Sequence, residues 1–224
     1  MLQSVRRTVV AFAVAAVVPS VMQAQVTYSS FSDFLAGVTS HGIDTFDDLN
    51  SGVVSGPLSR SAGSHSYSVA ASASPLNLFY PIENGSSSGD WWLSEETAGT
   101  SITFSGFGSN VRAIGGSFFA TDFNGGVSGT QLRIRALDVN GNVFDDVFSP
   151  ATADSFFGVR FDFALASLQI SAVNDQSGVY FFATADDLVL AESRSTVPEP
   201  SSLLLLSVGA AALCVVRVRR RDYR

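Results

Sequence analysis

Three pairs of adjacent aspartates are the residues of this sequence best suited to bind a metal ion. Each pair lies in or beside a stretch rich in Phe, Val or Leu, and the pairs are Asp47-Asp48, Asp145-Asp146 and Asp186-Asp187. Neighbouring residues of a strand point to opposite faces, so a pair inside a strand would send one carboxylate toward the packed side, where an uncompensated charge is costly. We therefore expect the pairs at strand ends, at bulges or against a cation.

The first and last pairs are expected to meet in space, because the first and last strands of a sandwich often lie side by side. Carboxylates, completed by backbone carbonyl oxygens, are the ligands that calcium prefers. The sequence thus predicts a calcium site from four residues: Asp47, Asp48, Asp186 and Asp187. The alternative is that these aspartates are solvated at strand ends or form ion pairs with Arg112 or Arg160.

Two adjacent tryptophans, Trp91 and Trp92, precede Glu95-Glu96 and offer an aromatic platform with a polar rim for a sugar ring. Adjacent side chains of a strand cannot both face one ligand, so we expect one tryptophan to pack in the core. The alternative is that both serve only packing at the core or rim.

Catalytic motifs are absent from the sequence. The two histidines, His41 and His65, lie in a turn and a serine-rich loop and are expected to be solvated. Glu95 and Glu96 come from one segment, whereas glycoside hydrolysis needs carboxylates on both sides of the scissile bond. We therefore expect no enzymatic activity, although sequence alone does not exclude a hydrolase site scattered over several strands.

Short strands are expected to position these residues. Ser32 is a suitable N-cap for one short helix that would continue through Val38 and end at Gly42. After it, stretches rich in Phe, Val, Ile and Thr alternate with glycine, serine or asparagine, beginning at Ile43–Leu49 and ending at Asp187–Leu190. The pattern predicts an all-β fold, an antiparallel two-sheet β-sandwich resembling a jelly roll.

The clearest expected hairpin runs from Leu132 through the turn Asn140-Gly141 to Phe148. Within it, Leu132, Ile134 and Ala136 should face the core while the two arginines between them face water.

Charge excludes a nucleic-acid partner. All 13 basic residues of the 224-residue chain are arginine, and residues 25–196 contain six of them against 18 Asp and Glu, a formal net charge of −12. Such a surface repels phosphate backbones and attracts cations. The single cysteine, Cys214, leaves the body without a disulfide.

Both ends of the chain look like targeting segments. Arg6-Arg7, an apolar run and a small-residue site ending at Ala24 predict a signal peptide over residues 1–24 that directs general secretion. Residues 25–192 then form the β-sandwich domain and residues 193–197 a linker. Residues 198–224 contain Pro-Glu-Pro, a predicted transmembrane helix at residues 203–216 and an arginine cluster that should stay cytoplasmic.

This C-terminal order of elements resembles the PEP-CTERM sorting signal of Gram-negative bacteria. The resemblance implies that the membrane protease exosortase recognises Pro198, Glu199 and Pro200 and removes the tail. Anchoring in the inner membrane through residues 203–216 would then be transient, and the protein would end at the cell surface or outside the cell. The alternative is an ordinary tail anchor in which Pro-Glu-Pro only interrupts the structure.

Short motifs of the middle also resemble the bodies of many PEP-CTERM proteins of unassigned function. They are Thr45–Leu49, Ile114–Phe119, Ser155–Gly158 and Ala185–Leu188. The resemblance implies a β-sandwich of the kind that carbohydrate-binding modules use. We therefore expect an exported, non-enzymatic surface or matrix protein associated with extracellular polysaccharide or biofilm; a carbohydrate-binding module, stabilised by calcium, is the alternative.

Overall fold

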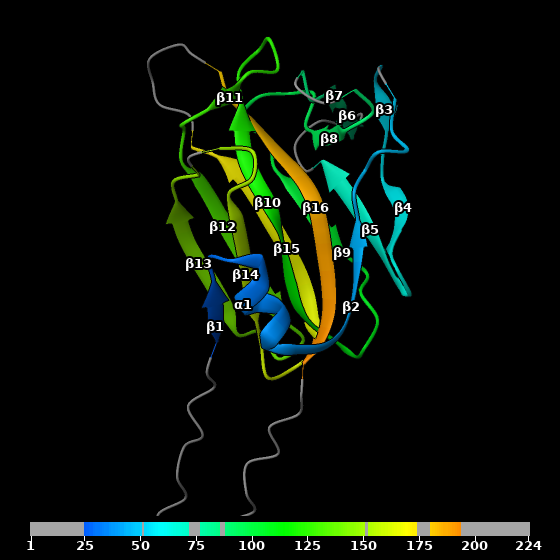
Figure 1. The fold of residues 1–224 in the computed structure, drawn as a ribbon, viewed down its shortest axis with the longest axis vertical. Helices are drawn as coiled ribbons and strands as arrows, with labels where there is room; N and C mark the ends of the chain where they lie inside the picture. Colours follow the sequence, from blue (N-terminus) through cyan, green and yellow to red (C-terminus); the bar gives the residue numbers. More distant parts are fainter. Residues whose placement is uncertain are drawn as a thin grey trace, which may run out of the picture.

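Two antiparallel sheets form the body of the protein in the computed structural model, which describes residues 25–50, 52–71, 77–85, 88–150, 152–173 and 180–193. Figure 1 shows the sheets facing each other, with the long strand β16 running the length of the sandwich. The predicted all-β sandwich is therefore confirmed. The predicted signal peptide and the predicted helix at residues 203–216 lie outside the described residues. Within the described ranges, no helix is long and apolar enough to cross a membrane.

The larger sheet has eight strands in the order β1-β14-β10-β16-β8-β7, with β11 beside one half of β10 and β2 beside one half of β16. Its strands are β1 (Val26–Tyr28), β2 (Val38–Asp44), β7 (Ile82–Glu83), β8 (Trp91–Ser94), β10 (Val111–Thr121), β11 (Val127–Ser128), β14 (Phe156–Arg160) and β16 (Phe182–Ser193).

The smaller sheet has six strands in the order β13-β12-β15-β9-β5-β4, and β3 pairs with β6 separately. These strands are β3 (Val54–Ser55), β4 (Leu58–Ala62), β5 (His65–Ala71), β6 (Leu78–Phe79), β9 (Ile102–Ser105), β12 (Leu132–Asp138), β13 (Val143–Phe148) and β15 (Leu165–Ala172).

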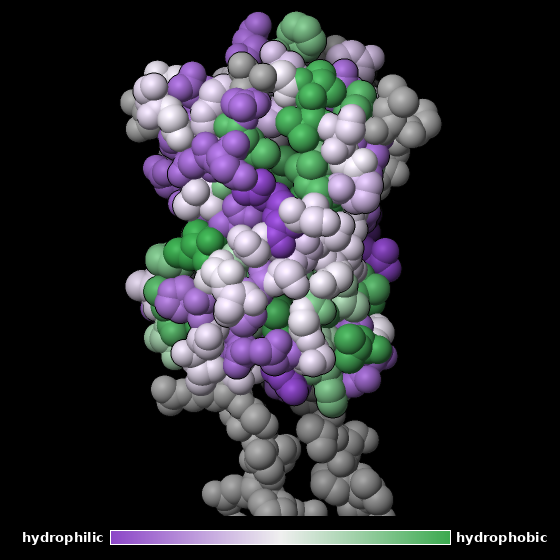
Figure 2. All heavy atoms as spheres, turned by 90° about the vertical axis from the view of Figure 1, so that its right-hand side faces the viewer, coloured by the Kyte–Doolittle hydropathy of each residue, from purple (hydrophilic) through white to green (hydrophobic). Residues whose placement is uncertain are grey.

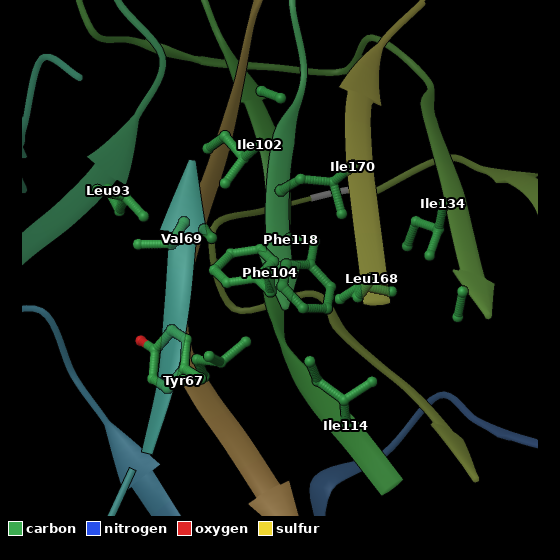
Figure 3. Packing of buried hydrophobic residues seen from close by; sticks show 14 of the residues in the cluster. Tyr67, Val69, Leu93, Ile102, Phe104, Ile114, Phe118, Ile134, Leu168 and Ile170 are labelled. Carbon is green, nitrogen blue, oxygen red and sulfur yellow. The ribbon is translucent and has the colours of Figure 1, made fainter. Parts of the chain in front are cut away.

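The core lies between the two sheets because alternate residues of each strand point inward. Figure 3 shows the ring of Phe104 of the smaller sheet beside the ring of Phe118 of β10, and Val69 and Ile114 belong to the same buried cluster. The predicted hairpin is confirmed: β12 buries Leu132, Ile134 and Ala136 and pairs along its length with β13.

The start of the domain differs from the prediction. The helix α1 spans Phe31–Ala36, because the Ser30 hydroxyl, and not Ser32, accepts the backbone N–H of Asp33, and Gly37 ends it. Strand β2 spans Val38–Asp44 and so contains only the first two residues of the strand expected at Ile43–Leu49. That prediction is wrong. The chain leaves the sheet after Asp44, and Phe46 has the left-handed φ of 59°.

The surface is not uniformly polar despite the acidic composition. Figure 2 shows the side of the sandwich formed by β2, β3 and β4, where hydrophilic residues cover the middle and hydrophobic residues gather toward the upper end. The two chain ends of the described body, the start of β1 and the end of β16, both lie at the lower end in Figure 1. The upper end of the sandwich is therefore the end farther from Ser193, the last described residue.

Candidate functional site

A bulge in β16 places Asp186 and Asp187. The register between β10 and β16 shifts where Ser117 faces Asp186 and Gly115 faces Val189, and Asp187 has a left-handed φ of 49°. On the other side of β16, Asp44 of β2 pairs with Leu188. The first long strand and the last one therefore lie side by side, as the sequence predicted, and the pair of aspartates occupies a bulge.

Five aspartates surround one shallow depression of about 390 Å³ beside this bulge, which we call the acidic depression. They are Asp47, Asp90, Asp154, Asp186 and Asp187. Burial, and then the negative charges of Asp187, Asp90 and Asp47, raise the pKa of Asp186 to about 8. Burial and the charges of Asp90, Asp47 and Asp154 also raise the pKa of Asp187. The carboxylates of the acidic depression therefore repel one another when they are ionised.

Asp48 does not reach the acidic depression. Its carboxylate accepts hydrogen bonds from Arg60, and the hydrogen bond and charge of that guanidinium hold the pKa of Asp48 below its usual value. Arg60 also binds Asp44, which is 6% exposed, through Nε at 2.7 Å and Nη2 at 2.6 Å. The partner of this aspartate is therefore Arg60, a residue that the sequence analysis did not consider for the role.

The acidic depression as placed does not form a complete metal site. Across the part of the chain that the structure describes, no group of three or more His, Cys, Asp or Glu side chains is arranged to hold a metal ion. Asp47, Asp186 and Asp187 nevertheless share one depression, and their carboxylate oxygens are of the type that Ca²⁺ binds. The calcium site stays a prediction.

The burial of Asp186, together with repulsion from the neighbouring aspartates, predicts that the protein loses stability as pH rises. Asp186 keeps its proton in the fold up to about pH 8 but loses it near pH 4 when unfolded, so the folded state binds more protons between these values. We expect the free energy of unfolding to fall from pH 5 to pH 8 by on the order of 2 kcal/mol, allowing for partial contact with water. Urea unfolding in the presence of a chelator measures this slope. In the Asp186→Asn variant the side-chain oxygen can still accept the Asp187 N–H, which lies 2.8 Å from Oδ1 of Asp186. This variant should show a smaller change of unfolding free energy with pH. An equally steep change would show that groups other than Asp186 cause the pH dependence.

Calcium is predicted to relieve the same repulsion. At pH 8, millimolar Ca²⁺ should raise the melting temperature of the wild-type protein and leave that of Asp186→Asn nearly unchanged, since a ligand that binds only the folded state stabilises it. Differential scanning calorimetry with chelator and with Ca²⁺ makes the comparison. An unchanged wild-type melting temperature would remove the calcium hypothesis.

Of the two tryptophans, Trp92 is a packing residue. It is 4% exposed and packs edge-on against Phe119, with ring centroids 4.8 Å apart. Trp91 is partly exposed at the start of β8, and its backbone N–H donates to Asp47 at 3.2 Å. Neighbouring strand residues point to opposite faces, so only Trp91 has a surface that a ligand could contact.

A second cavity, of about 430 Å³, opens at the upper end of the sandwich and has exposed aromatic side chains at its rim. We call it the aromatic pocket; its aromatic and aliphatic lining is Tyr80, Ile82, Phe123 and Phe182, and its charged lining is Glu95, Glu96 and Asp122. Tyr80 is 50% exposed and Phe123 is 87% exposed. Large aromatic rings left in water beside a cavity are characteristic of ligand-binding surfaces.

The loop that carries Phe123 is held by its own backbone. Asp122 Oδ1 accepts the N–H groups of Asn124 at 2.8 Å and Gly126 at 2.9 Å, and Gly125 adopts φ +80° close against Ile82. This turn holds its backbone in place while the Phe123 ring stays in solvent. The sequence analysis missed it, although an aspartate, an aromatic and Asn-Gly in succession after a strand are a readable turn signature.

Glu95 lies at the base of the aromatic pocket and is 1% exposed. Its carboxylate accepts the Ala183 N–H at 2.9 Å and the Thr100 hydroxyl, yet burial outweighs both hydrogen bonds and raises its pKa to about 7. Glu96 is exposed, and within the described part of the chain its carboxylate accepts one hydrogen bond, from the neighbouring Thr97 hydroxyl at 2.9 Å. The two glutamates therefore differ in environment.

The two histidines also differ in their exposure to solvent. His41 is exposed, as predicted, but it lies within strand β2 and not in a turn, whereas His65 is 6% exposed at the start of β5. The prediction of a solvated His65 is wrong, because the serine-rich stretch around it forms the β4–β5 hairpin and is not a loop.

Comparison with known proteins assigns the C-terminal segment. A family model of the PEP-CTERM protein-sorting motif matches residues 196–221. No curated protein sequence matches the chain significantly.

Two solved structures match part of the chain, both variants of a family 29 carbohydrate-binding module. One is 12% identical over 68% of this chain and 99% of its own, with a TM-score of 0.34; the other is 13% identical over 61% and 98%, with a TM-score of 0.29. At these TM-scores the likeness supports no argument about the ligand. The motif, in contrast, marks an exported protein that is anchored in the membrane before exosortase cleaves it. The chain therefore contains a PEP-CTERM sorting motif, which begins three residues after the last strand of the β-sandwich.

Proposed function

We propose that this protein is a non-enzymatic component of the cell surface or extracellular matrix that holds extracellular polysaccharide once exosortase has released it. The sorting motif supports the extracellular address. The aromatic pocket supports the binding role, and it is the observation on which the proposal rests. Its size is within the range of small-ligand sites.

The chemistry of the aromatic pocket suits a sugar. The exposed faces of Tyr80 and Phe123 can pack against the C–H face of a pyranose ring, while the carboxylates of Glu96 and Asp122 can accept its hydroxyl groups. Trp91 is partly exposed at the start of β8, outside the lining of the pocket, and we propose it as a contact for a longer chain that extends beyond the pocket. Trp92, buried against Phe119, contributes to the fold instead.

The position of the aromatic pocket also suits this role. Phe182 of the pocket starts β16, and Ser193 ends it, three residues before the sorting motif begins at residue 196. A strand of this length spans roughly 36 Å at about 3.3 Å per residue. Before cleavage, the pocket would therefore face away from the membrane, toward polymer outside the cell.

A glycan array and affinity electrophoresis of the secreted body test the proposal. We expect retardation by at least one extracellular polysaccharide, with Phe123→Ala weakening the affinity about tenfold because a stacking surface is lost. Tyr180→Ala is the matched control, since Tyr180 is an aromatic residue 65% exposed outside the pocket lining. Trp91→Ala should weaken binding of longer chains. No glycan signal, or unchanged affinity in Phe123→Ala, would contradict a binding role, and release of reducing ends would contradict the non-enzymatic assignment.

A further inference from the structure

The charged side chains that line the aromatic pocket are all carboxylates. Glu95, Glu96 and Asp122 line it, and none of the described residues around it is an arginine or histidine. The ion pairs of the described chain are formed elsewhere: Arg60 pairs with Asp44 and Asp48, while Arg133 and Arg135 lie next to Asp145. The negative charge of the pocket therefore has no cationic side chain opposite it.

The hydrogen bonds of these carboxylates leave their charge available to a ligand. Asp122 accepts two backbone N–H groups through Oδ1, and no side chain of the described residues donates to its Oδ2. Glu96 is exposed and contacts only a hydroxyl. Neutral donors of this kind orient a carboxylate but do not cancel its field, so the pocket attracts cations and repels anions.

Aromatic rings add a second preference for positive charge. The faces of Tyr80 and Phe123 carry the negative part of the ring quadrupole, and an ammonium group near such a face is attracted to it. A uronic acid or a phosphorylated sugar would be repelled by the carboxylates of Glu96 and Asp122. A sugar with a protonated amine would meet both carboxylate and ring, with the rest of its ring free to stack.

We propose that the aromatic pocket selects sugars that carry a free, protonated amino group, as units of a de-N-acetylated amino-sugar polymer, over N-acetylated and acidic sugars. This inference rests on the proposed polysaccharide-binding function and names the class of sugar. The selection depends on two features of the site, the exposed rings and the uncompensated carboxylates. Each feature can be removed by its own substitution.

Isothermal titration calorimetry at pH 6 with short glucosamine oligomers and their fully N-acetylated counterparts tests the selection. We expect the free-amine oligomer to bind at least tenfold more tightly, and added salt to weaken it. Glu96→Gln should weaken this binding severalfold, whereas Asp162→Asn, which removes the same charge from an exposed residue at the opposite end of the sandwich, should not.

A linear polyamine separates the site from general attraction to an acidic protein. It should bind more weakly than the glucosamine oligomer, and Phe123→Ala should weaken binding of the oligomer, which loses ring stacking as well, more than binding of the polyamine. Equal affinity for both oligomers would overturn the selection and leave the proposed function intact. If neither oligomer bound but another glycan on the array did, the selection for amino sugars would be overturned while the proposed function stood. If no glycan on the array bound, both the selection and the proposed function would be contradicted. If Glu96→Gln and Asp162→Asn weakened binding equally, the attraction would come from the net charge of the protein alone. The proposal that the aromatic pocket binds the amino group would then be overturned.

Discussion

Replacing Arg60 with alanine is expected to destabilise the fold by about 3 kcal/mol, because it leaves the buried carboxylate of Asp44 without its counter-ion. Asp44 accepts two hydrogen bonds from Arg60, one from the Tyr67 hydroxyl at 2.7 Å and one from the Phe46 N–H at 3.2 Å. The guanidinium also lies 5.1 Å from the centre of the Phe46 ring. One arginine therefore holds the end of β2 against β4 and β5.

Urea unfolding measures this loss, which corresponds to a melting temperature lower by about 6–12 °C for a domain of this size. Arg135→Ala is the control, since Arg135 is 47% exposed and its closest carboxylate contact is 3.9 Å; it should change stability little. If Arg60→Ala and Arg135→Ala were equally stable, the network around Asp44 would not be a determinant of the fold.

Replacing Glu199 with alanine is expected to abolish processing, with nearly all of the protein retained in the membrane fraction. The reason is the sorting motif at residues 196–221, in which Pro198, Glu199 and Pro200 are the proposed recognition residues. Immunoblots of membrane and extracellular fractions measure the distribution. Ser201→Ala, a change of similar size directly after Pro200, should be processed like the wild type. Release of Glu199→Ala at the normal rate would show that this residue is not recognised.

Local patterns in the sequence were sufficient for much of the fold. The alternation of apolar residues and arginines in Leu132–Leu137, followed by Asn140-Gly141, predicted the hairpin of β12 and β13 because burial and turn chemistry agree there. The adjacent aspartates at Asp186 and Asp187 indicated a strand end, a bulge or a cation, and the structure places them at a bulge. In both cases the information lies within a few residues.

Long-range partners could not be read in this way. The Ile43–Leu49 stretch is apolar enough for a strand, but Asp44 is bound by Arg60 from β4, and the backbone turns away at Phe46. The pairing of β2 with β16 was expected, but the carboxylate of Asp48 binds Arg60 and does not line the acidic depression. The aromatic pocket gathers Tyr80, Phe123 and Phe182 from three distant segments, so no single window of sequence contains its pattern.

The intact mass of the mature protein, recovered from the outside of cells that express exosortase, tests the central claim most directly. The account predicts a mass that lacks both the N-terminal leader and the arginine-rich end of the chain, with the β-sandwich of residues 25–193 complete. A protein recovered with its last residue, Arg224, still attached, or found only in the cytosol, would contradict export through the sorting motif and with it the proposed meeting with extracellular polysaccharide.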